Sequence, residues 1–165
     1  MKVLLRSAVV LLLSSGSAFA ATGNTSTIAG SATATVVAPI TLTHTPGAAL
    51  KFGTVTRGTG GTVVVTAAGA ASVTGDVGLA PGTINGADAF TVTGDAARSF
   101  SVATSAGSLV SGANSMAFTT TASAGSVTLS AGGTGTFTVG GTLTVPATAV
   151  AGAYTGTYTA TVTYN

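Results

Sequence analysis

Hydrophobic and polar residues alternate with a period of two along almost the whole chain, and no stretch repeats at the 3.6-residue period of a helix. The last segment alternates most regularly, with threonines at its odd-numbered positions from 155 to 163. Its even-numbered positions are Tyr154, Gly156, Tyr158, Ala160, Val162 and Tyr164. Because successive side chains of a strand point to opposite faces, this pattern predicts a half-buried β-strand over residues 153–164.

The same pattern predicts nine further strands, separated by turn signals that contain Gly, Pro or Asn. They are expected at residues 31–37, 40–45, 50–55, 62–67, 90–93, 99–103, 116–121, 126–130 and 134–145. This succession of short strands predicts an all-β fold, an immunoglobulin-like antiparallel β-sandwich. A small outer-membrane barrel is the rival fold, but three tyrosines in one strand cannot form the two aromatic girdles that it needs.

Two pairs of neighbouring strands are interpreted as hairpins. Residues 90–104 would turn at Gly94-Asp95, and residues 134–146 would turn at Gly140-Gly141. A glycine pair admits the positive φ that a tight hairpin requires. The Gly140-Gly141 pair could equally mark a bulge within one long strand, and both interpretations stay open.

The first twenty residues have the three parts of a secretory signal peptide. Lys2 and Arg6 precede an apolar run at residues 8–13, and Ala18-Phe19-Ala20 matches an A-x-A cleavage site. We expect cleavage after Ala20 and export to the periplasm, followed by display at the cell surface or secretion. A retained anchor is the alternative, although the apolar run is too short to span a bilayer.

The chain is therefore expected to have three parts. Residues 1–20 form the signal peptide, residues 21–38 an N-terminal extension, and residues 39–165 the sandwich domain. Without the signal peptide the charges balance, because the remaining cations and carboxylates are equal in number. They are Lys51, Arg57 and Arg98 against Asp76, Asp88 and Asp95.

This balance limits the partners that the sequence suggests. No basic patch indicates nucleic acid or an anionic membrane surface, and no second apolar run predicts a membrane span. The chain has no Cys and so forms no disulfide. A surface with so few charges suits a subunit that packs against copies of itself, although a stable surface of Thr and Ser hydroxyls is an equal alternative.

Residues that could carry catalysis are scarce. The single histidine, His44, lies beside a turn and is interpreted as an ordinary surface residue. The three aspartates each lie alone near turn residues, so we interpret them as turn formers rather than calcium ligands or a catalytic pair. No metal-ligand cluster, nucleotide loop or nucleophile elbow occurs. We therefore expect no enzyme activity, cofactor or metal.

The residues before the predicted sandwich alternate as well. One face of residues 27–37 carries Ile28, Gly30, Ala32, Ala34 and Val36. Pro39 follows, and a proline cannot donate to a central ladder. Two separate extended segments are therefore expected on either side of Pro39.

Four stretches carry a resemblance to a known family. They are ATATVVAPITLTHT, ALKFGTV, FTVTGD and AGAYTGTYTATVTYN, which together span most of the predicted domain. In these stretches the chain resembles the secreted sandwich proteins of domain-of-unknown-function family 4402. More distantly, it is similar to the spore-coat-protein-U group and to archaic chaperone–usher pilins, because Tyr164 is penultimate and Gly152 is fourteenth from the C-terminus.

The pilin resemblance implies a fimbrial subunit of a pilus on the bacterial cell surface, with a role in cell adhesion. In such subunits the sandwich lacks its last strand, and a periplasmic chaperone pairs with the terminal strand before an outer-membrane usher assembles the filament. The next subunit's extension then fills the groove by β-augmentation. The resemblance implies that Tyr154, Tyr158, Val162 and Tyr164 form the receiving strand, that Gly152 permits close approach, and that Ile28, Gly30, Ala32, Ala34 and Val36 donate.

A self-contained sandwich is the alternative, a secreted or periplasmic binding module of unknown ligand whose N-terminal strand pairs within its own chain. Its candidate ligand loops are residues 67–75 and 104–115, although neither loop contains an aromatic or charged residue. The donor face is small, since burying Ile28 and Val36 contributes roughly 3–6 kcal/mol in total. A weak filament is therefore compatible with the sequence.

Overall fold

The computed structural model describes residues 23, 25 and 27–165. The predicted signal peptide lies outside the described residues. The chain divides into two units, Met1–Thr35 and Val36–Asn165. Residues 27–35 of the first unit are exposed and carry no assigned strand. None of the described residues belongs to a helix with the length and hydrophobicity needed to cross a bilayer.

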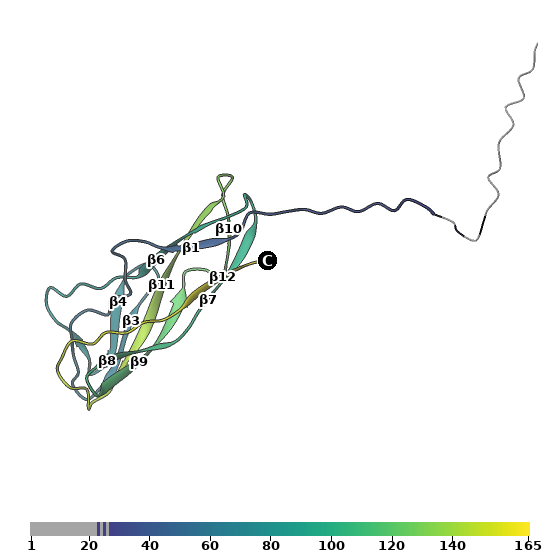
Figure 1. Cartoon of the computed structure of the whole chain (residues 1–165). Helices are drawn as coiled ribbons and strands as arrows, with labels where there is room; N and C mark the ends of the chain where they lie inside the picture. The colour runs from purple at the N-terminus through teal and green to yellow at the C-terminus, as the bar shows by residue number, and fades with distance from the viewer. Residues whose placement is uncertain (1–22, 24, 26) are drawn as a thin grey trace, which may run out of the picture. The chain divides into compact units, whose positions relative to one another are not determined.

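The second unit is built from antiparallel sheets (Figure 1). The largest has seven strands: β1 (Thr41–His44), β3 (Gly61–Val65), β4 (Ala71–Gly75), β6 (Asp88–Thr93), β8 (Gly107–Ser111), β9 (Asn114–Ala122) and β11 (Thr134–Val145). The second sheet has the order β10 (Ser126–Thr128), β7 (Ser99–Thr104) and β12 (Ala160–Tyr164). Two short strands, β2 (Val55–Thr56) and β5 (Gly78–Leu79), form a third sheet.

The two larger sheets pack against each other through buried side chains. Phe100, from β7 of the three-stranded sheet, is fully buried against Phe90 of β6 and Phe137 of β11. The rings of Phe90 and Phe137 stack with their centroids 5.1 Å apart. Residues from two sheets thus share one core, which is the defining feature of a β-sandwich. The predicted all-β antiparallel sandwich is confirmed.

The strand β11 changes its partner halfway along. Its first half pairs with β6 and its second half pairs with β3. The opposite edge of β11 pairs with β9 at residues 139–143, which span the point where the partner changes. The register of this pairing is unbroken. The hairpin predicted at Gly140-Gly141 is therefore wrong, and these residues belong to one long strand.

Close approach of neighbouring backbones explains the two glycines. A Cβ at Gly140 would overlap the carbonyl oxygen of Val65, at the end of β3. A Cβ at Gly141 would overlap the carbonyl oxygen of Thr119 in β9. Glycine is the residue that lets two strands approach this closely where β11 passes from one partner to the next.

The other predicted hairpin is also wrong. The strands β6 and β7 lie in different sheets and face each other across the core. The loops predicted at residues 67–75 and 104–115 contain the strands β4 and β8. These strands consist mainly of small and hydroxyl residues, so they show little of the hydrophobic period that reveals a strand in a sequence.

The segments predicted as strands at residues 31–37, 50–55 and 153–164 are for the most part not assigned as strands. The segment at residues 50–55 contributes only a bridge from Lys51 to Gly86 and the first residue of β2. The last strand, β12, begins at Ala160 rather than at residue 153. No strand is assigned at residues 31–37.

Candidate functional site

One edge of the three-stranded sheet is open. In the extended segment before β12, Thr155 exchanges two backbone hydrogen bonds with Val110, and the carbonyl of Thr159 accepts one from Ser105. The strand β12 continues this pairing through β7. An extended chain directs the backbone N–H and C=O groups of successive residues to opposite sides. Those of the even-numbered residues therefore point away from these partners. Among the described residues, no backbone group pairs with β12 on that other side.

The strand β1 supplies a second open edge. It pairs with β6, and the pairing continues where the Thr45 amide donates to the carbonyl of Ala89. The backbone groups of Leu42 and His44 therefore face the opposite side. At one end the two open edges meet, since the Tyr164 hydroxyl lies 3.1 Å from the carbonyl oxygen of Ala38 and donates to it.

A continuous cleft runs between the segment before β12 and the chain that follows β1. Its wide half has a volume of about 900 Å³ and its narrow half about 380 Å³. The wide half is lined mainly by residues 50–57, by residues 149–156 and by the buried side chains of Met116, Leu143 and Val145. The narrow half has Phe90 and Phe118 among its lining residues. Leu50, Phe52, Leu109 and Gly156 line both halves, so the two hollows form one cleft.

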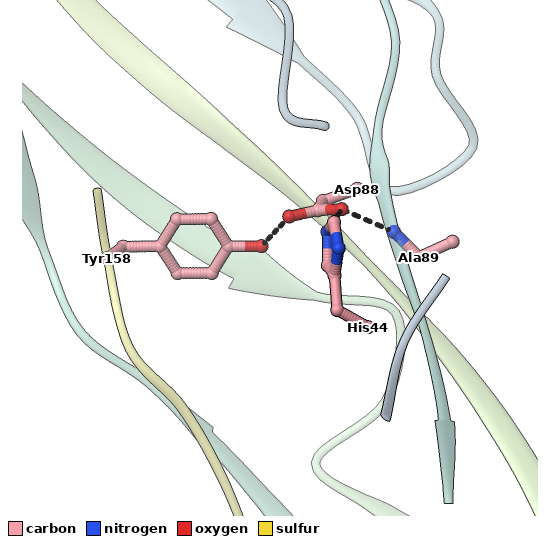
Figure 2. A network of polar contacts seen from close by, with 4 residues as sticks. All are labelled: His44, Asp88, Ala89 and Tyr158. Carbon is pink, nitrogen blue, oxygen red and sulfur yellow. Dashed lines mark hydrogen bonds and ion pairs between the residues drawn. The ribbon is translucent and has the colours of Figure 1, made fainter. Parts of the chain in front are cut away.

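A buried carboxylate lies in the wall of the narrow half. Asp88 is 5% exposed, and Figure 2 shows Tyr158 and His44 pointing toward it from different segments. The Tyr158 hydroxyl donates to Oδ2 at 2.7 Å, and the Ala89 amide donates to Oδ1 at 2.9 Å. Nε2 of His44 lies 2.6 Å from Oδ1. Since a carboxylate only accepts hydrogen bonds, Nε2 carries a proton in this arrangement.

This group of three residues links the terminal segment to the strands β1 and β6 at the cleft. His44 and Asp88 belong to adjacent strands of the seven-stranded sheet, whereas Tyr158 belongs to the segment before β12. Burial and the bond to Asp88 raise the pKa of Tyr158 far above its usual value, so the phenol stays protonated as a donor. A hydroxyl donated to a carboxylate is among the stronger hydrogen bonds of a protein. Tyr158 therefore fastens the terminal segment to β6.

Sequence reasoning missed this group. The interpretation of Asp88 as a turn former is wrong, because Asp88 is the first residue of β6 and points into the core. The interpretation of His44 as an ordinary surface residue is also incomplete, since its side chain is 48% exposed yet bonded to Asp88. A usable signal existed, because Asp88 alternates in phase with Phe90 and Val92, which are both buried.

The expected receiving residues gather along the cleft and the core beside it. Gly152 and Tyr154 line the wide half, and Tyr158 lines the narrow half. Val162 and Tyr164 pack against the buried residues around Phe90, Phe100 and Phe137. Of the expected donor residues, Ile28 and Val36 are 97% and 94% exposed, and Gly30, Ala32 and Ala34 are exposed as well.

The fold and the cleft define an antiparallel β-sandwich domain in which two strand edges border an open, mainly apolar cleft. The family model described as "Domain of unknown function (DUF4402)" matches residues 40–164. The chain therefore belongs to this family, as its sequence motifs predicted. Neither a curated protein nor a solved structure matches the chain. Its similarity to pilins and to the spore-coat-protein-U group stays a prediction.

Proposed function

We propose that this protein is an exported, non-catalytic structural subunit that forms a fimbria-like surface filament by strand exchange. The observation that carries the proposal is the open backbone edge from Tyr154 to Tyr164, which borders an apolar cleft. An exposed edge normally carries charges or proline that prevent pairing, and this segment carries neither. An added strand would satisfy its backbone groups and cover the apolar lining.

The proposed occupant is the segment at residues 27–37 of a second copy. Its even-numbered positions form an apolar face that has large residues, Ile28 and Val36, only at its two ends. In the terminal segment, Tyr154 and Val162 are separated by the same number of residues as Ile28 and Val36, and Tyr154 lies beside the wide half. Placing the two spans opposite each other brings the Gly and Ala positions of the donor over the narrow half of the cleft.

The direction of the donor follows from the position of Ala38. Tyr164 holds Ala38, the last residue of the receiving chain's own extension, at the C-terminal end of the open edge. If the C-terminal end of the donor segment lay beside Val162, the domain that follows it would have to occupy the place already taken by the receiving chain's own extension. The donor therefore runs antiparallel to the terminal segment, with Val36 opposite Tyr154 and Ile28 opposite Val162.

Within its own chain, the extension cannot run antiparallel to the terminal segment. To lie in the cleft of its own chain, it would have to reverse at residues 38–39 and run parallel to the terminal segment. Two-residue hairpin turns need positive φ, whereas Pro39 fixes φ near −65°. This disfavours the self-contained binding module. The loops proposed as its ligand site are in large part the strands β4 and β8.

Partners in assembly follow from the same edge. A periplasmic chaperone would cover it until an outer-membrane usher brings the next subunit. Assembly at the usher would deliver the filament to the cell surface, where adhesion is its proposed role.

The test of this proposal is a gel of the exported protein, purified from the periplasm or cell surface, loaded with and without boiling in SDS. Each joint would bury a whole strand, so we expect a ladder of oligomers that collapses to monomer on boiling. A single monomer band in the unboiled sample, across a range of protein concentrations, would exclude the filament.

Engineered disulfides test the direction, and the absence of native Cys leaves no background. We expect Thr35→Cys with Thr155→Cys to give covalent oligomers under oxidising conditions, because these exposed threonines face each other between two copies in the antiparallel arrangement. The matched control is Thr35→Cys with Thr161→Cys, which would face each other within one chain if the extension filled its own cleft. Intrachain cross-linking of the control pair, without oligomers of the first pair, would reverse the assignment.

A further inference from the structure

We propose that association between copies is controlled by pH through His44, and that a proton on His44 strengthens the joint. This inference rests on the proposed function, since it concerns the cleft that receives the second copy. It adds a regulatory role for a histidine that the joint itself does not require.

The geometry places a titratable pair where the incoming strand would lie. His44 and Asp88 both line the narrow half of the cleft, and Nε2 and Oδ1 lie 2.6 Å apart. The Asp88 side chain is already 7% exposed, whereas that of His44 is 48% exposed. An added strand along the β1 edge would cover the remaining surface of His44.

Other charges near His44 are few. The groups that face it are Asp88 from β6, Tyr158 from the terminal segment and the ring of Phe90, whose centroid lies 5.1 Å from that of the imidazole. Its own strand contributes no titratable group. The narrow half is lined by no Lys or Arg among the described residues, so His44 is the cation available to Asp88 there.

The sign of the effect follows from the net charge that closure buries. With neutral His44, the incoming strand closes over a carboxylate whose charge is not balanced. With protonated His44, it closes over an ion pair of zero net charge, whose attraction increases as water leaves. Burying an unpaired charge costs more than burying a hydrogen-bonded pair. The closed joint therefore binds the proton more tightly than the open cleft does, and it weakens as pH rises.

The whole chain contains one histidine, the side chain that ordinarily titrates between pH 5 and 8. Analytical ultracentrifugation of the exported protein at about pH 5.5 and about pH 8 would test the proposal. We expect the apparent dissociation constant between copies to be about five- to tenfold lower at the acidic pH, a size common for coupling between linked sites.

Two variants test whether the pH dependence of association comes from the pair of His44 and Asp88. His44→Gln keeps an N–H for Asp88 but cannot gain a proton, and Asp88→Asn removes the negative partner while leaving His44 in place. We expect His44→Gln to associate to the same extent at both pH values. Asp88→Asn should instead associate less at the acidic pH, because closure would then bury an imidazolium without its carboxylate partner. Circular dichroism melting would verify that each is folded, and the half-exposed His44 makes its variant the safer of the two.

The outcomes separate the inference from the proposed function. Association of the wild-type protein that is equal at both pH values, or pH dependence that persists in folded His44→Gln, would overturn the role of His44 and leave strand exchange intact. Failure of the wild-type protein to associate at either pH would overturn strand exchange and, with it, this inference.

Discussion

Replacing Ile28 and Val36 together by Asp is expected to abolish the SDS-resistant ladder and to leave the domain itself as stable as before. These two side chains are the large apolar residues of the proposed donor face, and burying them would contribute roughly 3–6 kcal/mol to each joint. Two buried, unpaired carboxylates would add a further penalty. Both positions are almost fully exposed in the single chain, so folding loses little. Unboiled gels and circular dichroism melting measure the two effects.

A control variant with the same change of charge is available in the same segment. Thr27→Asp with Thr35→Asp has the same spacing but lies on the opposite face of the extension. This control should keep the ladder, and the thermal midpoint of both double variants should stay within about 2 °C of the wild-type value. Equal loss of the ladder in both variants would show that charge in the extension, rather than the apolar face, determines assembly.

Gly141→Ala is expected to destabilise the sandwich more than any exposed substitution would. The added Cβ would overlap the Thr119 carbonyl oxygen, which belongs to the backbone of the neighbouring strand β9. The strands would have to separate at the point where β11 passes between its partners. Overpacking of this kind costs about 1–3 kcal/mol. The thermal midpoint should fall by roughly 2–4 °C for each kcal/mol lost.

Gly135→Ala in the same strand is the matched control. Its added Cβ would lie 3.3 Å from side-chain carbons of Leu129 and Phe100, which can adjust by a few tenths of an ångström. Replacing Gly by Ala also reduces the conformational freedom of the unfolded chain. We therefore expect a change in stability within about 1 kcal/mol of zero. If both alanine variants melt at the same temperature, close approach of β9 is not the reason for Gly141.

The sequence predicted those parts of the fold in which side-chain alternation is strong. The strands β6, β7 and β11 contain the buried Phe90, Phe100 and Phe137, and their positions follow from the period of two. The strands β4 and β8 were missed because small residues on both faces produce no such period. Strand partners could not be predicted at all, since the transfer of β11 from β6 to β3 depends on residues distant in the sequence.

The candidate site was predictable in part for the same reason. Alternation in the last segment identified Tyr158, Val162 and Tyr164 as one face, and these side chains are half-buried between exposed threonines. The interpretation of Asp88 as a turn former is wrong because it rests on the nearby Asn85 and Gly86, which favour a turn. The phase of Asp88 with the buried residues of β6 was the stronger evidence. The bond from Tyr158 to Asp88 joins β6 to a segment distant in the sequence, so local sequence could not reveal it.

The bond between Tyr164 and Ala38 also determines how a filament would carry mechanical load. It keeps Ala38, the last residue of a subunit's own extension, beside Tyr164, whereas the donated strand of the proposed joint would enter beside Tyr154. Tension along the filament would therefore pull the donor parallel to the terminal segment. The hydrogen bonds of the joint would then be sheared together rather than opened one after another, which is the geometry in which paired strands resist force best.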